Sequence, residues 1–212
     1  MAADWVAISS LATAGGTLVL AVATFGSVRS ANRAARVAEE SLLAGIRPVL
    51  VASRPEDPPE KVSFSDNHFV RVHGGRGIAE ATDDAIYLAI ALRNVGSGLA
   101  VLDRWDFYPE RQKGGDATHR APESFHRLTR DLYVPAGYLG FWQGVFREPT
   151  DPDFAVARAA IEQRQDLTVD LVYSDHEGGQ RTITRFALIP KGESEWMAIV
   201  ARHWNLDRDD PR

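Results

Sequence analysis

The chain has 212 residues, of which 44% are apolar and 25% charged, a composition typical of a folded protein with one ordinary domain and some additional chain. The net charge of −5 is divided unevenly, because residues 1–48 carry +1 and the remaining 164 residues carry −6. Such an acidic body argues against nucleic-acid binding, which needs a basic surface. The absence of cysteine excludes disulfides, thiolate metal sites, a cysteine nucleophile and a lipid-modified cysteine.

An uncharged segment covers residues 5–28, and as an α-helix it would be about 36 Å long, enough to cross a hydrocarbon core of about 30 Å. Residues 21–23 (AVA) have the small-x-small form of a signal-peptide cleavage site. A signal peptide also needs a basic start, whereas the first four residues carry only Asp4. A buried core helix would usually be shorter. We therefore predict an uncleaved transmembrane helix over residues 1–28, in contact with the bilayer through residues 5–28.

The charges that flank this segment predict its orientation. Arg29, Arg33 and Arg36 follow it directly, and no lysine or arginine precedes it. Because positive charges are retained on the cytoplasmic side of a membrane, we expect the N-terminus outside and the rest of the chain in the cytoplasm. Almost all basic residues are arginine, as in GC-rich coding genomes, and we expect the inner membrane of a bacterium.

Small residues follow one face of the membrane segment at four-residue intervals. Ser9, Thr13 and Thr17 lie on this face, with Gly16 beside them. Small side chains at this spacing let two membrane helices approach closely. The face is therefore a candidate for self-association between two copies, although small residues are also common in membrane helices that do not associate.

Helix-forming residues continue beyond the membrane segment until Gly45. A narrow apolar stripe of two heptads lies on this part of the helix, at Val28, Ala31, Ala35, Ala38 and Leu42. Two heptads of mostly alanine are too few for a convincing coiled coil. We predict that residues 29–46 form a helical stalk that packs on its own domain or on the membrane surface.

After Pro48 the apolar pattern changes to the period of two that is typical of strands. The strongest strand is expected at residues 85–93, where apolar residues on both faces indicate a central position in a sheet. Residues 94–98 (NVGSG) and 175–179 (DHEGG) are expected to be tight turns between neighbouring strands. The expected strands are residues 49–53, 64–72, 85–93, 99–108, 132–134, 138–146, 166–174 and 180–190, and residues 196–205 suit a final strand or a helix.

One helix interrupts the strands. Thr150, with Asp153 three residues later and a proline in the first turn, predicts a helix that runs to about residue 165. The polar residues 109–122 are expected to form an exposed loop. Short strands with glycine and proline between them predict that residues 47–212 form an antiparallel β-sandwich, immunoglobulin-like, with one inserted helix.

Three segments carry a resemblance to known proteins. Residues 92–98 (LRNVGSG) look like a turn of membrane-anchored bacterial β-sandwich proteins. Residues 176–186 (HEGGQRTITRF) and 202–208 (RHWNLDR) resemble an uncharacterised family of actinobacterial single-span membrane proteins, and this resemblance covers nearly the whole chain. It implies a membrane helix followed by a β-sandwich-like domain, and it implies no particular activity.

The standard catalytic and cofactor motifs are absent. The sequence has no P-loop, no H-E-x-x-H and no G-x-S-x-G, and residues 74–77 (GGRG) lack the spacing of a dinucleotide-binding turn. His176 lies between Asp175 and Glu177 at a predicted turn and could ligate a metal or exchange protons. Adjacent residues in a tight turn point in different directions, however, which favours a plain polar turn. We predict no catalytic residue, no cofactor and no metal site.

Tryptophans provide the best candidates for ligand binding. On a regular strand Asp103 and Trp105 would share one face, and Trp105 with Trp142 could form an aromatic platform for a sugar or a peptide. Trp204 has a polar edge formed by its neighbours in the sequence. Tryptophans of this kind more often fill a sandwich core. The candidate ligand-binding residues are Trp105, Trp142, Asp103, His176 and Trp204.

These observations leave three hypotheses for function. The first is a membrane-tethered cytoplasmic protein-interaction domain, an accessory subunit or a scaffold, because the edges of a sandwich can accept a partner strand. The second is a ligand-binding or sensory β-sandwich domain that uses the tryptophans. The third is a hydrolase with a site that no motif indicates, and the absence of motifs argues against it.

Overall fold

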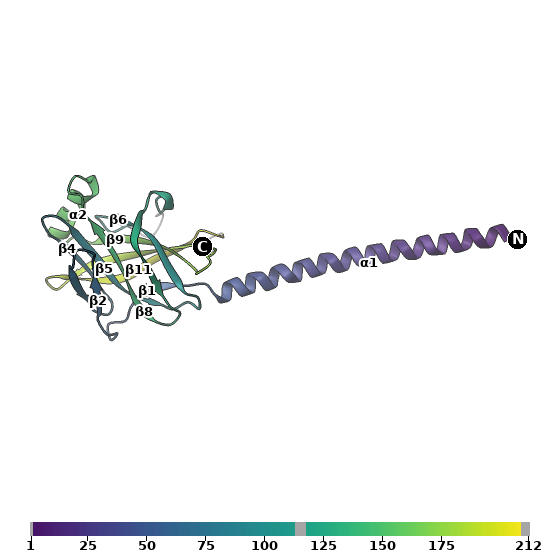
Figure 1. Ribbon diagram of the computed structural model, residues 1–212, viewed down its shortest axis with the longest axis horizontal. Helices are drawn as coiled ribbons and strands as arrows, with labels where there is room; N and C mark the ends of the chain where they lie inside the picture. Colours follow the sequence, from purple (N-terminus) through teal and green to yellow (C-terminus); the bar gives the residue numbers. More distant parts are fainter. Residues whose placement is uncertain (1, 113–117, 209–212) are drawn as a thin grey trace. The chain divides into compact units, whose positions relative to one another are not determined.

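The computed structural model describes residues 2–112 and 118–208 of the chain. The chain divides into two compact units, Met1–Ala44 and Gly45–Arg212 (Figure 1). The first unit consists of a helix and the second is mainly β. The division falls between Ala44 and Gly45, whereas the sequence analysis expected the second domain to begin at residue 47.

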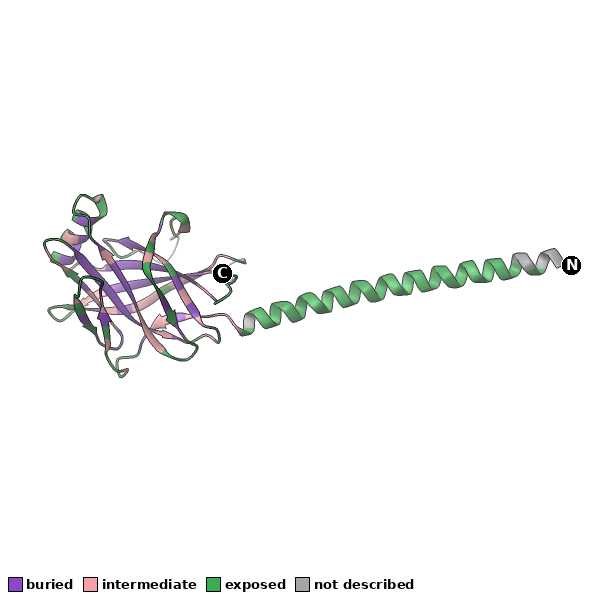
Figure 2. Cartoon of the chain, viewed as in Figure 1, coloured by how far each residue is buried: buried purple, intermediate pink, exposed green. Residues whose placement is uncertain are grey.

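The tether is one uninterrupted helix, α1 (Ala2–Gly45), in which the predicted membrane segment and stalk are continuous. A helix of 44 residues is about 66 Å long. Its part Ile8–Leu43 contains a stretch long and apolar enough to cross a membrane, and its apolar side chains are exposed (Figure 2). The hydroxyls of Thr13 and Thr17 donate to carbonyls one turn earlier, at 2.9 and 2.8 Å, so their polar groups are satisfied without water.

The second unit is a β domain, built from antiparallel strands and one inserted helix, α2 (Pro152–Glu162). Within the described residues, nine strands form one sheet and two form a separate hairpin. The strands are β1 (Leu50–Ala52), β2 (Glu60–Ser63), β3 (Phe69–Val72), β4 (Arg76–Ala81), β5 (Ile86–Asn94), β6 (Ala100–Tyr108), β7 (His126–Val134), β8 (Leu139–Phe146), β9 (Leu167–Ser174), β10 (Thr182–Lys191) and β11 (Glu195–Asn205).

The large sheet curls on itself. Its main path runs β5-β4-β11-β10-β9-β6-β7, while β1 and β8 also pair with β5. Because β8 pairs with β5 at the start of this path and β7 stands at its other end, β7 and β8 are the two outer strands. They follow one another in the chain and lie side by side (Figure 1). The domain is a β-sandwich-like fold formed by one curled antiparallel sheet, which confirms the predicted fold class.

Two apolar clusters stabilise this arrangement. The inside of the curl is filled by large side chains, among them Trp142, Trp196 and Phe186, and one end is covered by α2. The β2–β3 hairpin covers the outer face of β5, where Val62 and Val72 pack against its small side chains. Each large apolar side chain that is fully buried contributes about 1.5–3 kcal/mol to folding. Because β5 is covered on both faces, its predicted central position is confirmed.

Several elements agree with the sequence prediction. The 175–179 turn joins β9 and β10 as a hairpin, and residues 196–205 belong to strand β11 and not to a helix. Helix α2 begins after Asp151, whose side chain caps it by accepting from the Asp153 amide, in place of the predicted Thr150, and it ends three residues earlier than expected. Residues 113–117 of the predicted exposed loop lie outside the described residues.

The prediction of a single strand over residues 64–72 is wrong. The structure has a hairpin in which β2 pairs with β3, and residues 64–68 form the turn. Asn67 adopts a left-handed backbone conformation with φ of 63°, which this tight turn requires. Strand β4 follows directly and was also missed, because glycines at 74, 75 and 77 obscure its alternating pattern.

The prediction that residues 94–98 form a turn between paired strands is also wrong. β5 pairs with β1, β4 and β8, whereas β6 pairs with β7 and β9, so the segment crosses between parts of the sheet. Its glycines serve a different purpose. A Cβ atom on Gly98 or Gly96 would overlap the backbone of residues 46–49, which lies directly against this loop.

The chain that enters the domain after α1 is thus held by a glycine cradle, residues 94–98. The Ser97 and Val95 amides donate to the carbonyls of Arg47 and Val49, at 3.2 and 2.8 Å, and the Val49 amide donates to Asn94 Oδ1 at 3.1 Å. The Arg47 guanidinium also binds side chains at the end of β11, including Asp207. The entry segment is therefore part of the folded domain and not a loose linker.

A polar network holds the tip of the β2–β3 hairpin. Asp66 accepts hydrogen bonds from Tyr87 Oη at 2.7 Å, Arg147 Nη1 at 2.8 Å and the His68 amide at 3.1 Å. Partial burial by itself raises the pKa of Asp66, but the hydrogen bonds outweigh this effect and lower the pKa to about 2. The ionised carboxylate is therefore the form that stabilises the closed hairpin.

The hairpin is expected to loosen in acid before the sheet does. The contribution of Asp66 is complete above its ordinary pKa of 3.8 and is lost as the pH falls through about 2. Amide chemical shifts of Val62 and Val70, followed from pH 6 to about pH 2, should move while that of the buried Leu188 in β10 stays constant. Asp66→Asn should show the loosened hairpin already at pH 6. Simultaneous changes in the hairpin and at Leu188 would contradict this account.

Candidate functional site

The structure brings together two of the five predicted ligand-binding residues. The rings of Trp105 and Trp142 are 5.4 Å apart, edge to face, and both side chains are buried in the core inside the curled sheet. Gly144 lies against both rings, and a Cβ atom there would come within 2.6 Å of Trp142 Cζ2. The pair is a core element, and Trp105 in addition lines a small cavity between β7 and β8.

Asp103 does not share a face with Trp105, contrary to the prediction. The register between β6 and its partners shifts between Leu102 and Arg104, so β6 has a bulge at Asp103. The bulge places Leu102 and Trp105 on the same core face, while Asp103 is exposed beside Arg104. A regular alternation of faces does not apply across such a bulge.

The other two candidates lie apart from these. His176 is exposed in the β9–β10 turn, with its Nε2 3.8 Å from Glu177. Trp204 packs in a small cluster with Phe125, Val172 and Ile183, separate from the core that contains Trp105. Its ring contacts His119 and the guanidinium of Arg185. The five candidates therefore do not form one site.

A buried ion pair was missed by the sequence analysis. Arg185 donates to both carboxylate oxygens of Asp170, at 2.7 and 2.6 Å, and both side chains are almost completely buried. The guanidinium lies between the rings of Tyr108 and Trp204. Burial, with the charges of Asp170 and Asp106, raises the pKa of Tyr108 to about 12, so its hydroxyl stays protonated at neutral pH.

The sequence contains a signal for this pair. Asp170 is the one charged residue within residues 167–174, and Arg185 is the one charged residue within residues 182–190. Asp170 lies seven residues before the centre of the predicted turn at 175–179, and Arg185 lies eight residues after it. An antiparallel hairpin therefore places them close to one another, and in the structure they pair directly. The pair belongs to the structural framework of the domain.

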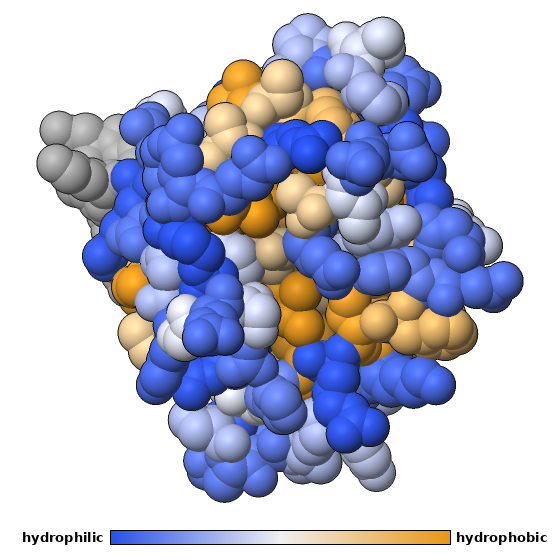
Figure 3. Space-filling model, turned by 90° about the vertical axis from the view of Figure 1, so that its left-hand side faces the viewer, coloured by the Kyte–Doolittle hydropathy of each residue, from blue (hydrophilic) through white to orange (hydrophobic). Residues whose placement is uncertain are grey.

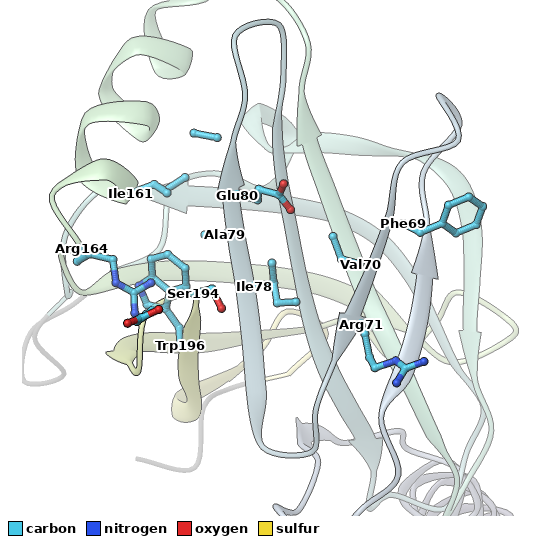
Figure 4. A pocket seen from close by; sticks show the side chains of 12 residues that line it. Phe69, Val70, Arg71, Ile78, Ala79, Glu80, Ile161, Arg164, Ser194 and Trp196 are labelled. Carbon is cyan, nitrogen blue, oxygen red and sulfur yellow. The ribbon is translucent and has the colours of Figure 1, made fainter.

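A groove of the β domain lies where β3, β4, the end of α2 and the β10–β11 turn meet (Figure 4). We call it the β4 groove; its volume is about 480 Å³. It is lined by Phe69, Val70, Arg71, Ile78, Ala79, Glu80, Ala81, Ile161, Arg164, Glu193, Ser194 and Trp196. A groove of this size is within the range of binding pockets.

Unpaired strand edges border the β4 groove. β5 pairs with Gly77–Ala81 on one side of β4, whereas β11 begins at Glu195 and reaches only Ile78 on the other side. Past Ile78, the second edge of β4 has no strand partner in the described sheet. β3 pairs with β2 alone, so its other edge is open as well. Unpaired backbone groups of this kind are a template for another strand.

Arg164 forms the wall opposite β3. It follows the end of α2 in the left-handed conformation, with φ of 54°, a position where glycine is common. Its guanidinium lies 4.0 Å from the centre of the Trp196 ring and donates to the carbonyls of Gly192 and Glu195, at 3.1 and 2.9 Å. The side chain thereby fixes the β10–β11 turn against α2 and keeps the groove open beside β4.

The groove combines an apolar floor with a charged rim. Ile78 and Val70 face one another across it in Figure 4, and Phe69 is 51% exposed on the β3 side. Arg71, Glu80 and Glu193 carry charges of both signs at the rim. Figure 3 views the end of the domain where β4 and α2 lie, and apolar surface is visible there in a hollow between hydrophilic side chains.

Within residues 2–112 and 118–208 there is no group of three or more acidic or histidine side chains that could hold a metal ion. No family model matches the chain, and no curated protein and no solved structure matches it. The function of the protein is therefore inferred from the arrangement of its own residues.

Proposed function

We propose that the protein is a membrane-tethered interaction domain, an accessory subunit or scaffold, that binds an extended segment of a partner protein in the β4 groove. The observation that carries the proposal is the open edge of β4 inside an apolar groove. A partner strand there would continue the sheet past the start of β11, and its side chains would alternate between the floor and the rim.

The composition of the groove supports an extended protein segment as the ligand. Main-chain hydrogen bonds to β4 would supply affinity without a fixed sequence, while Val70, Ile78 and Trp196 would accept apolar side chains. The exposed ring of Phe69 would lose water-accessible surface on binding. Charges of both signs at the rim would set the direction and register of the partner.

The tether supports a location at the inner membrane of a bacterium. In this proposal residues 5–28 cross the bilayer, with the N-terminus outside and the soluble domain in the cytoplasm. Arg29, Arg33 and Arg36 support this orientation because they follow the apolar segment directly. The face with Ser9, Thr13 and Thr17 would additionally allow two copies to associate within the membrane.

Ser194→Trp is expected to abolish partner binding, because the exposed Ser194 borders the groove and an indole there would occupy the space of the partner strand. The measurement is affinity purification of the full-length protein in mild detergent, with quantitative mass spectrometry. Co-purification of a partner in fixed proportion should fall at least about tenfold, a loss of about 1.4 kcal/mol or more.

The matched control is Ser124→Trp, which introduces the same side chain in place of an exposed serine in the turn before β7. Phe69→Ser should weaken binding in part, because it removes the exposed ring and leaves the edge of β4 intact. Equal partner recovery with Ser194→Trp, Ser124→Trp and the unmodified chain would overturn the proposed function.

A further inference from the structure

A polar cavity lies between the tip of the β2–β3 hairpin and the strands β7 and β8, and we call it the hairpin cavity. Its volume is about 350 Å³, within the range of small-molecule sites. It is lined by Ser63, Phe64, Ser65, Asn67, Thr129, Arg130, Gln143, Val145 and Arg147. None of these described residues is acidic and two are arginines, although residues 49–212 together carry a net charge of −6. The lining therefore favours an anion.

A wide bulge of β7 brings two neighbouring residues to this cavity. Between its pairs with β7, strand β6 contributes the single residue Asp103, whereas β7 contributes residues 128–131. On a regular strand Thr129 and Arg130 would point to opposite faces. Both line the hairpin cavity, because the bulge interrupts this alternation. Bulges that redirect a side chain in this way are frequent beside functional sites.

Arg130 keeps most of its hydrogen-bonding capacity for a ligand. Its side chain is exposed, and its Nη1 donates to the Ser63 carbonyl at 3.3 Å. This contact uses one N–H of a guanidinium that carries several. No carboxylate of the described residues is paired with Arg130. The positive charge of Arg130 is therefore available to an anion in the cavity.

Arg147 is held at the cavity by contacts with the hairpin turn. Its Nη1 donates to Asp66 Oδ2 at 2.8 Å and its Nη2 donates to Ser65 Oγ at 2.9 Å. The side chain remains 39% exposed. Asp66 compensates one of the two guanidinium charges, so Arg130, Arg147 and Asp66 together keep one net positive charge. The position of Arg147 is fixed before any ligand binds.

Hydroxyl groups and an apolar wall complete the lining. Ser63, Ser65 and Thr129 each contribute a hydroxyl, which can donate to a phosphate oxygen. Because Ser65 Oγ accepts from Arg147, its own O–H can donate to a ligand. Val145 and Phe64 supply the apolar part. An inorganic phosphate ion would fill only part of this volume, so the ligand carries an organic group as well.

We propose that the hairpin cavity binds a phosphate monoester of a small organic group, with the phosphate bound by Arg130 and Arg147. The planar fork of a guanidinium matches the spacing of phosphate oxygens, and such charge-assisted hydrogen bonds are strong. A phosphate monoester carries close to about two negative charges at neutral pH. Its organic group would contact Val145 and Phe64. This site is separate from the β4 groove and does not depend on the proposed function.

The place of the cavity within the β domain favours a soluble ester over a lipid headgroup. Strand β8 begins at Leu139, which pairs with Arg93 beside the glycine cradle of the entry segment. Arg147 follows the other end of β8. A strand of 8 residues is about 25 Å long, so Arg147 lies far from the point where the chain enters the domain.

The test uses phenyl phosphate as the probe, with the full-length protein in nanodiscs of neutral lipid. Ligand-detected saturation transfer to its ring protons should be saturable, and inorganic phosphate should displace the probe. Phenol, which has the same ring without the phosphate, should bind at least about tenfold more weakly. A signal that does not saturate, or equal binding of phenol, would overturn the proposal.

Three variants assign the binding to the cavity. Arg130→Gln should raise the Kd of phenyl phosphate at least about tenfold, because an exposed guanidinium is lost without a change in the core. Arg130→Lys keeps the charge but not the fork, so its loss should be intermediate. Arg54→Gln removes an exposed arginine outside the lining and should leave the Kd unchanged. An unchanged Kd for Arg130→Gln, or equal losses for Arg130→Gln and Arg54→Gln, would contradict the assignment.

Two further kinds of nanodisc separate a soluble ester from a lipid headgroup. Phosphatidic acid has a phosphate monoester headgroup, whereas phosphatidylglycerol has an anionic phosphate diester. The Kd of phenyl phosphate should be the same in discs that contain either lipid. A higher Kd in the phosphatidic acid discs would show that the lipid headgroup competes for the cavity, and it would overturn the assignment to a soluble ester.

Discussion

Arg185→Met is expected to lower the free energy of unfolding by about 3–5 kcal/mol, since it leaves the Asp170 carboxylate buried without its partner. Asp170 is fully buried, and its two oxygens accept hydrogen bonds from Arg185 at 2.7 and 2.6 Å. Urea unfolding of the full-length protein in detergent, followed by tryptophan fluorescence, measures the change. Trp204 lies 4.8 Å from the Arg185 guanidinium and reports directly on this region.

A double variant separates the loss of the pair from the loss of packing. Asp170→Leu combined with Arg185→Met should recover most of the stability, because no uncompensated charge remains buried. The exposed control is Arg158→Met, whose ion pairs with Glu162 and Asp83 lie at the surface of α2. That variant should change the free energy of unfolding far less than Arg185→Met does, because solvent screens an exposed ion pair. Similar effects of Arg185→Met and Arg158→Met would contradict the assigned role.

Gly98→Ala is expected to release the entry segment of the domain and to cost at least about 2 kcal/mol, because backbone overlap cannot be relieved by a rotamer change. A Cβ atom at this position would overlap the Ile46 carbonyl. The Val49 amide, which donates to Asn94 Oδ1, and the Leu50 amide, which donates to Tyr173 Oη, should lose protection from hydrogen exchange. Exchange in the β9–β10 hairpin should rise much less.

Gly179→Ala is the matched control, because a Cβ atom there would meet nothing closer than 4.0 Å. Its stability should stay within about 0.5 kcal/mol of the unmodified chain. If Gly98→Ala leaves the Val49 and Leu50 amides protected, residues 94–98 are an ordinary connection and not a cradle for the entry segment.

The sequence predicted those parts of the fold that depend on local pattern. The strand at 85–93 and the 175–179 hairpin have clear alternation and turn residues, and the α2 start has both a cap and a proline. Each of these signals depends on a few neighbouring residues, so the structure that it predicts does not change with the packing of distant segments. The apolar run of α1 is equally local, because it needs only length and the absence of charge.

The errors concern features that two distant segments produce together. The bulge at Asp103 exists only in relation to β7 and β9, and it changes which residues face the core. The glycines of residues 94–98 are explained by the backbone of residues 46–49, about 50 positions earlier in the chain. The β4 groove likewise depends on where β11 begins beside β4. No short pattern contains this information.

The measurement that tests the membrane-tethered arrangement most directly is cysteine labelling from the two sides of the membrane. The chain has no cysteine, so Ala3→Cys and Ser124→Cys each introduce a single reactive thiol. In intact bacterial spheroplasts, a membrane-impermeant maleimide should label Ala3→Cys directly and Ser124→Cys only after lysis. Labelling of Ser124→Cys in intact spheroplasts, or recovery of the protein in the soluble fraction, would contradict a cytoplasmic domain held by a membrane helix.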